Sequence, residues 1–184
     1  MVYYQVEIAK HMTLIEHEKY RFLITDCPSQ EYLEHYVREF RQHNVKHVVR
    51  ACQSPYEPRI LHENSIKTHD CSFPDGGIPS REIITKWIAL VEGTFCNSTE
   101  APTIAVHCIA GLGRAPVLVA IALIEYGMTP LDAIDYIRSK RRGAFNSKQI
   151  QFLDSYKRRG GLKKSFALFR LFTRKQQPSL VSCE

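Results

Sequence analysis

The feature that most constrains the fold is a short apolar strand pattern, followed by a glycine-bearing turn and a long apolar helix pattern. Thr103-Ile-Ala-Val-His107 has the length and composition of a central strand that is buried on both faces of a sheet. After Gly113 a helix pattern continues to about Tyr126 and stops at Gly127. A strand of this kind needs helices on both faces, so the sequence predicts an α/β fold.

The other segments of the chain alternate between strand and helix patterns. Strands are predicted at 21–25 and 45–51, with a weaker candidate at 66–69, and helices at about 28–43, 80–91, 130 onward and 147–156, with Ser80, Thr129 and Ser147 as N-caps. The segments at 54–58, 73–79 and 97–102 have the composition of loops. This order predicts a central, mostly parallel sheet flanked by helices.

The length of 184 residues suits one domain, which we expect at 1–158 with a basic tail at 159–184. Residues 155–183 contain eight Lys or Arg and no acidic residue. The net charge of +6 therefore comes from the C-terminal end, and the rest of the chain is nearly neutral. This distribution argues against nucleic acid as a partner. The apolar runs are too short to span a membrane and no signal pattern is present, so we expect a cytoplasmic protein.

The six cysteines are widely scattered and form no C-x-x-C pair. They are Cys27, Cys52, Cys71, Cys96, Cys108 and Cys183. Such cysteines are typical of free thiols in a reducing compartment rather than of a disulfide framework or a zinc site. No metal or other cofactor is therefore expected.

The turn after the central strand has the pattern of an anion site. Cys108 follows the strand directly, and Arg114 comes six positions later, where the helix begins. Gly111 and Gly113 allow backbone angles that point successive N–H groups inward, and the helix N-terminus adds partial positive charge. The sequence predicts a phosphate-binding loop made of Cys108, Ile109, Ala110, Gly111, Leu112, Gly113 and Arg114.

The residue types in this loop indicate nucleophilic chemistry. Arg114 can hold two phosphate oxygens with its planar guanidinium, and the positive field favours the thiolate form of Cys108. Attack of that thiolate on phosphorus gives a phosphocysteine without a metal ion. A structural cysteine in a tight turn is the competing interpretation, but it leaves Arg114, both glycines and the helix start unexplained.

The leaving oxygen needs a proton, and two aspartates are candidates for the general acid. Asp75 lies in the Pro- and Gly-rich loop, where Gly76 and Gly77 allow the loop to close. Asp70 directly follows a strand, so we expect Asp75 to be the acid.

The segment Val106-His-Cys-Ile-Ala-Gly-Leu-Gly-Arg-Ala-Pro-Val-Leu-Val-Ala120 resembles the signature of the phosphatases of regenerating liver, the protein tyrosine phosphatases of type 4A. Segments 21–25, 49–52, 73–76 and 140–149 also resemble motifs of that family, in order, so the resemblance covers about residues 20–158. It implies the three-layer α/β sandwich of the cysteine-dependent dual-specificity phosphatases.

The resemblance also implies roles for residues and partners. It makes Cys108 the nucleophile, Arg114 the phosphate clamp and Asp75 the general acid, and it implies a reversible disulfide between Cys52 and Cys108. Members of the family bind magnesium-transport mediators of the cyclin-M type through the active-site face, and they can form homotrimers. Ala115 stands where most tyrosine phosphatases have Ser or Thr, and the family shares this alanine, which implies slow turnover.

The C-terminal segment predicts weak binding to membranes. Its basic residues are interleaved with phenylalanines at helical spacing, which favours peripheral association with an anionic surface at the inner face of the plasma membrane or endosomes. Packing of this apolar stripe on the domain is the alternative. The family's prenylation box is not found, since Cys183 is followed by Glu184 alone, so we expect reversible binding.

Three functions are consistent with these residues. A protein tyrosine phosphatase is the first, and a pseudophosphatase-like module that docks a partner in the pocket is the second. A phosphoinositide phosphatase is less favoured, because such enzymes commonly have lysines in the loop, whereas Ile109, Ala110 and Leu112 make an apolar rim. A rhodanese-type sulfurtransferase is a more remote alternative.

Overall fold

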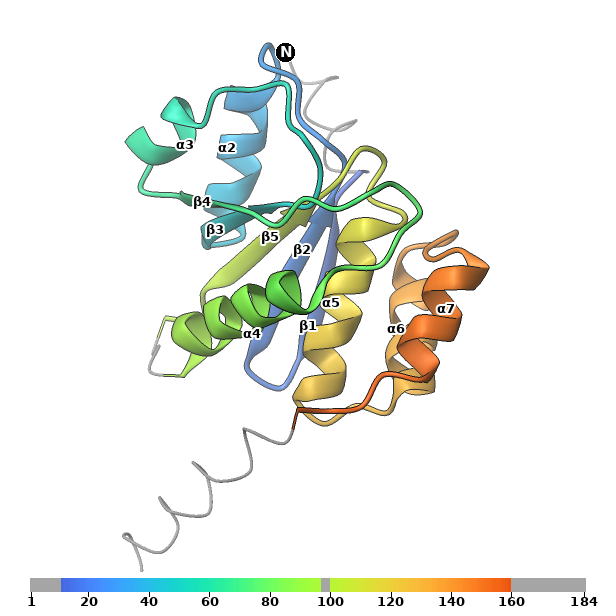
Figure 1. The fold of residues 1–184 in the computed structure, drawn as a ribbon. Coiled ribbons are helices and arrows are strands. Elements are labelled where there is room, and N and C mark those ends of the chain that lie inside the picture. The colour runs from blue at the N-terminus through green and yellow to red at the C-terminus, as the bar shows by residue number, and fades with distance from the viewer. Residues whose placement is uncertain (1–10, 97–99, 160–184) are drawn as a thin grey trace, which may run out of the picture.

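The computed structural model describes residues 11–96 and 100–159, which form a three-layer α/β fold around one sheet (Figure 1). The sheet has the order β1-β2-β5-β3-β4. Its strands are β1 (Thr13–His17), β2 (Tyr20–Thr25), β3 (Val45–Arg50), β4 (Lys67–Asp70) and β5 (Thr103–His107). Every residue of β5 is buried, and β5 pairs in parallel with both β2 and β3. The predicted central strand is confirmed.

Strand β1 is an antiparallel edge strand that the sequence pattern did not predict. Only Ile15 of its five residues is fully buried, so the segment lacks the long apolar run that identifies a central strand. The mostly parallel sheet is therefore closed at one edge by an antiparallel hairpin.

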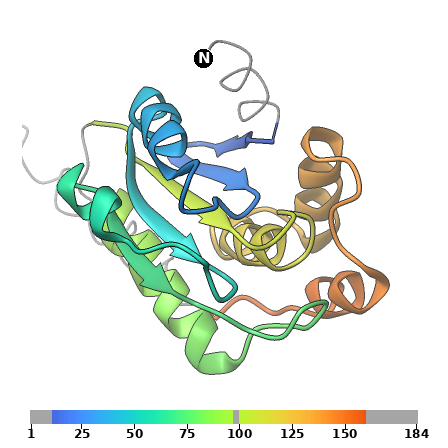
Figure 2. The ribbon, with the colours of Figure 1, turned by 90° about the horizontal axis from the view of Figure 1, so that it is seen from above.

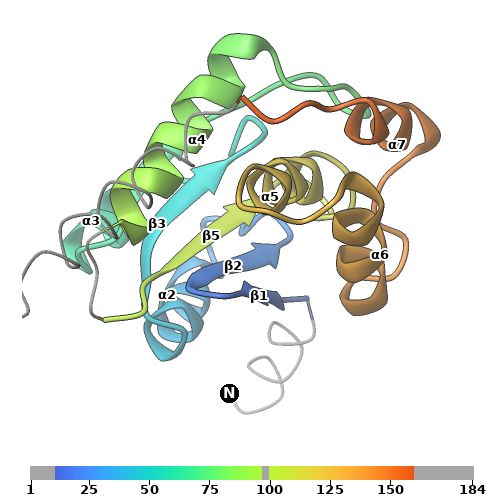
Figure 3. The same ribbon diagram turned by 90° about the horizontal axis from the view of Figure 1, so that it is seen from below.

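Helices cover both faces of the sheet, as Figures 2 and 3 show from the two ends. They are α2 (Leu33–Gln42), α3 (Arg59–Glu63), α4 (Arg81–Phe95), α5 (Arg114–Glu125), α6 (Pro130–Lys140) and α7 (Ser147–Asp154). One hydrophobic core lies between α2, α3 and one face of the sheet. A larger core lies between the other face and the four helices α4, α5, α6 and α7. Helix α5 is buried along its whole length between the sheet and its neighbouring helices.

Several helix starts differ from the prediction. Helix α2 begins at Leu33, although Pro28 and Ser29 resemble a helix start, because the chain first makes a turn in which the Tyr32 amide donates to the Ser29 carbonyl. The cap of α7 is Asn146 rather than Ser147. The short helix α3 was not predicted.

Two helix caps are confirmed. The Ser80 hydroxyl accepts from the Ile83 amide, and Thr129 accepts from the Asp132 amide with Pro130 in the first turn. None of the helices in the described ranges is long and apolar enough to cross a membrane. The predicted tail lies outside these ranges except for Arg159, whose guanidinium donates to Thr85 and to the Arg81 carbonyl.

Candidate active site

The loop between β5 and α5 forms one wall of a pocket of about 330 Å³. Cys108 lies at the carboxyl end of the central strand and is 3% exposed. The pocket is lined by Asp75, Gly76, Cys108, Ile109, Ala110, Leu112, Gly113, Gly143, Phe145, Asn146 and Gln149. The fold thus brings the predicted thiol and the predicted acid into one pocket.

The two glycines of the loop are required for different reasons. Gly111 has a φ of +67°, and a Cβ atom there would lie 2.5 Å from the Thr25 carbonyl oxygen. Gly113 has a φ of −115°, and a Cβ atom there would lie 3.2 Å from Nε2 of Gln149. The expectation of special backbone angles therefore holds for Gly111 through its left-handed φ, whereas Gly113 provides space beside a buried side chain.

Arg141 orients the loop from behind. Its guanidinium donates to the carbonyls of Gly111 and Ala110 and to Oγ1 of Thr13. A peptide plane points its C=O and N–H in opposite directions, so carbonyls held by Arg141 leave the amide groups to face the concave side. A second restraint is the bond from the Cys27 amide to the Ile109 carbonyl, at 2.9 Å. The local sequence pattern does not indicate that Arg141 is part of the site.

Arg114 has a free donor beside the loop. The residue is 7% exposed, its Nη2 lies 3.1 Å from Oδ1 of Asp75, and its Nη1 donates to the Phe73 carbonyl. Its Nε is one of three buried side-chain polar atoms without a hydrogen-bond partner among the described residues. Such an atom suits an arginine that binds an anionic ligand.

Asp75 lies on an exposed loop that is held at its base by the start of α7. Its side chain is 87% exposed. Nδ2 of Asn146 donates to the Gly76 carbonyl at 3.0 Å, and Nε2 of Gln149 donates to the Gly77 carbonyl at 3.1 Å. The capping box of α7 therefore anchors the loop that presents Asp75. The sequence motif at 140–149 was noted, but these contacts were not foreseen.

Asp70, the competing acid, is bound elsewhere. Both of its carboxylate oxygens accept from Arg50, at 2.6 and 2.8 Å. This pairing holds the pKa of Asp70 below its usual range, and Asp70 does not line the pocket that contains Cys108 and Asp75.

The rim of the pocket is apolar. Ile109 is 59% exposed and Leu112 is 40% exposed, although both are large hydrophobic residues. The variable loop positions hold no basic side chain. This surface suits a flat ring better than a polyphosphate headgroup.

Cys52 follows β3 and lines a second pocket together with Asp75 and Arg114. The neighbouring Cys27 thiol lowers the pKa of Cys52, and His107 and Arg114 act in the same direction. The proximity of the two thiols, together with burial, raises the pKa of Cys27. The family resemblance implies a role for Cys52, but no sequence pattern indicates that Cys27 lies beside it.

Known proteins that resemble this chain identify its family. Residues 16–159 match the family model described as "Swiss Army Knife protein, DSP-PTPase phosphatase domain". The chain is 48% identical over 145 residues to the probable protein tyrosine phosphatase type IVA A of Dictyostelium discoideum, covering 79% of this chain and 87% of that protein. It is 43% identical over 159 residues to the PRL-1 phosphatase of Drosophila melanogaster, covering 86% and 90%.

A solved structure gives the same result. The putative protein tyrosine phosphatase from Leishmania major is 40% identical, with a TM-score of 0.74, and the match covers 80% of this chain and 99% of that one. The kinase associated phosphatase, at 19% identity and a TM-score of 0.66, shares the fold. The chain therefore belongs to the type IVA, or PRL, family of protein tyrosine phosphatases, and it is a phosphatase with a dual-specificity-type domain.

Proposed function

We propose that this tyrosine phosphatase acts through a phosphocysteine on Cys108. The Cys108 thiolate attacks phosphorus, the S–P bond forms as the ester P–O bond breaks, and Asp75 gives its proton to the leaving oxygen. The observation that supports this most strongly is the unpartnered Nε of Arg114, a donor kept for a phosphate oxygen beside the loop.

In the second half of the reaction, water hydrolyses the S–P bond. The Asp75 carboxylate takes a proton from that water, and Cys108 leaves as a thiolate. Ala115 has no hydroxyl to stabilise the departing thiolate, so this step is slow. The enzyme needs no metal ion for either step.

Substitutions of Cys108 and Arg114 test the proposal. Cys108→Ser should abolish hydrolysis of an aryl phosphate, because a serine hydroxyl is not ionised at neutral pH. Arg114→Lys replaces a planar donor by a point charge and should lower kcat/KM about a hundredfold. Cys96→Ser, at an exposed thiol outside both pockets, is the control. Near-normal hydrolysis by Cys108→Ser would refute the mechanism.

We propose phosphotyrosine in proteins as the substrate rather than inositol lipids, because the exposed Ile109 and Leu112 offer apolar contact to a phenyl ring. A panel of phosphopeptides and phosphoinositides tests this. Ile109→Lys should reduce hydrolysis of a phosphotyrosine peptide relative to a phosphoserine peptide, which has no phenyl ring. A preference of the unaltered enzyme for phosphoinositides would contradict it.

We further propose that Cys52 protects the nucleophile from oxidation. Peroxide converts the Cys108 thiolate to a sulfenic acid, and Cys52 displaces water from it to form a disulfide. Mass spectrometry after mild peroxide should find the Cys52–Cys108 peptide. Recovery of Cys52→Ser by reductant that is as complete as wild type would count against this role.

The apolar rim also supports a role as a binding module for a magnesium-transport mediator of the cyclin-M type. We propose a homotrimer as the assembled form on the family resemblance alone. Ile109→Asp should then weaken binding of that partner, whereas Leu131→Asp, at an exposed leucine outside the pocket, should not. Light scattering tests the trimer.

We propose a cytoplasmic protein that associates peripherally with the inner face of the plasma membrane or endosomes through its basic tail.

A further inference from the structure

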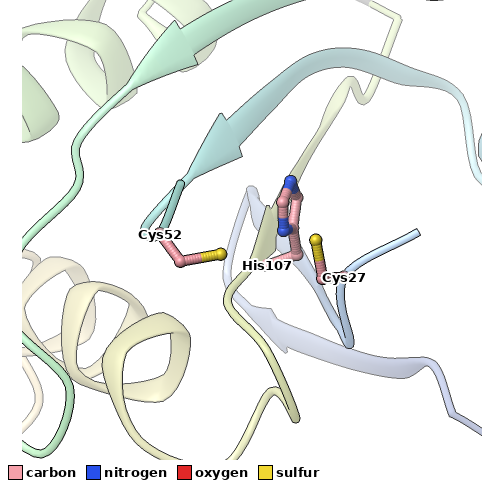
Figure 4. A group of neighbouring side chains, drawn as sticks. All are labelled: Cys27, Cys52 and His107. Atoms are coloured by element: carbon pink, nitrogen blue, oxygen red, sulfur yellow. The ribbon is translucent and has the colours of Figure 1, made fainter. Parts of the chain in front are cut away.

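Three potential metal ligands meet behind the phosphate loop. The sulfur atoms of Cys27 and Cys52 and a ring nitrogen of His107 all lie within 4.8 Å of one another, the one such group of His, Cys, Asp or Glu found in the described ranges. Figure 4 shows both sulfur atoms beside the ring of His107. The residues come from the carboxyl ends of β2, β3 and β5, which are neighbours in the sheet.

His107 has a nitrogen available for a ligand. The residue is 1% exposed, and its Nε2 lies 2.7 Å from the hydroxyl of Tyr56. Its Nδ1 is buried and has no hydrogen-bond partner within residues 11–96 and 100–159. The hydroxyl oxygen of Tyr56 can accept from Nε2–H at this distance. In that tautomer the Nδ1 lone pair is free to bind a metal ion. Metal-binding histidines commonly donate their other ring N–H to a neighbouring group, which fixes the orientation of the ring.

The two thiols complete a soft ligand set. Both cysteines are free of disulfides, Cys52 lines an open pocket that offers a path for an ion, and Cys27 is only half-buried. Two sulfur ligands and one imidazole favour a borderline-soft ion with tetrahedral preference. We propose that Cys27, Cys52 and His107 form a Zn²⁺ site with three protein ligands and an open fourth position.

Such a site changes the chemistry next to Cys108. Binding displaces the thiol proton of Cys27, and of Cys52 where protonated, to solvent. It engages Cys52, so that this thiol no longer reacts with an oxidised Cys108, and it fixes the ring that directly precedes the nucleophile. Zinc would thereby connect metal availability to the redox state of the enzyme.

The test uses full-length Cys108→Ser, which removes the catalytic thiol as an alternative ligand. Under reducing conditions, Co²⁺ should bind with one equivalent and give thiolate-to-cobalt charge-transfer absorption, which Zn²⁺ then abolishes by displacement. Adding Cys27→Ser or Cys52→Ser should weaken Co²⁺ binding at least about tenfold. Loss of a residue that only orients a metal ligand already costs about that much in affinity, and these variants lose a ligand itself. Cys71→Ser, at a buried thiol outside the cluster, should leave the Co²⁺ affinity and the absorption band unchanged.

The change in Tm on adding Zn²⁺ is measured within each variant, so a variant that is less stable without metal does not obscure the result. Zn²⁺ should raise the Tm of Cys108→Ser and not that of Cys108→Ser with Cys27→Ser, because a ligand stabilises only the state that binds it. Absence of the charge-transfer band, equal affinity after Cys27→Ser, or binding only when Cys108 is present would each overturn the proposal.

Discussion

Ala115, the residue after Arg114, is fully buried beside the phosphate loop. Ala115→Ser adds a hydroxyl that can donate to the departing Cys108 thiolate, so the phosphocysteine should decay faster while its formation is unchanged. Single-turnover traces would show a similar burst and a faster second phase. An unchanged second phase would mean that another step limits turnover.

The histidine pair of β3 and β4 makes stability depend on pH. Nδ1 of His47 lies 3.0 Å from Nε2 of His69, and burial, with a smaller effect from His69 and Lys67, lowers the pKa of His47 to about 4 from 6.5. The unfolded chain therefore binds more protons between these values, so the free energy of unfolding should fall as pH drops from 6.5 towards 4.

His47→Gln should weaken that pH dependence. Burial also lowers the pKa of His69, so part of the dependence should remain in His47→Gln and become smaller again when His69 is replaced as well. Urea unfolding at a series of pH values measures this. An identical pH profile in His47→Gln would rule out the pair as its source.

At the scale of elements, the turn between β5 and α5 depends on close backbone contact at Gly111. Gly111→Ala places a Cβ atom against the Thr25 carbonyl in a left-handed conformation, so it should cost about 1 to 3 kcal/mol and abolish activity. Gly93→Ala in α4 meets nothing within 4 Å and should stabilise by up to about 1 kcal/mol. Urea unfolding and aryl phosphate hydrolysis compare the two.

The cap of α7 positions the loop of Asp75. Asn146→Ser keeps a capping oxygen for the Gln149 amide but loses the hydrogen bond to the Gly76 carbonyl. Loss of one hydrogen bond costs about 1 kcal/mol, so kcat should fall roughly fivefold. The deficit should be larger for esters with poor leaving groups, because they depend most on the general acid. An equal deficit for all leaving groups would indicate a role unrelated to Asp75.

At the scale of the whole molecule, charge separates the body from the C-terminal end. The eight basic residues between 157 and 175 should attract anionic lipid at roughly 1 kcal/mol for each that reaches the surface, although Arg159 already contacts the domain. Co-sedimentation with anionic liposomes should decrease sharply at high salt. Binding that survives high salt, or none at low salt, would contradict an electrostatic tail.

Elements with local signals could be predicted from the sequence alone. The apolar run of β5, the Gly111 turn, and the caps Ser80 and Thr129 depend on a few adjacent residues, so they were predicted correctly. The local signal failed where tertiary contacts dominate. The turn before α2 overrode the helix start at Pro28, and β1 is stabilised by pairing with β2 rather than by its own pattern.

Contacts between side chains that are distant in the sequence could not be predicted from it. Arg141 reaches the phosphate loop because α6 ends beside it, and Asn146 meets the loop of Asp75 because α7 packs beneath that loop. Cys27 joins Cys52 and His107 because β2 and β3 lie on either side of β5. The physical reason is that strand order and helix packing are set by burial of the whole core, which no spacing along the chain encodes.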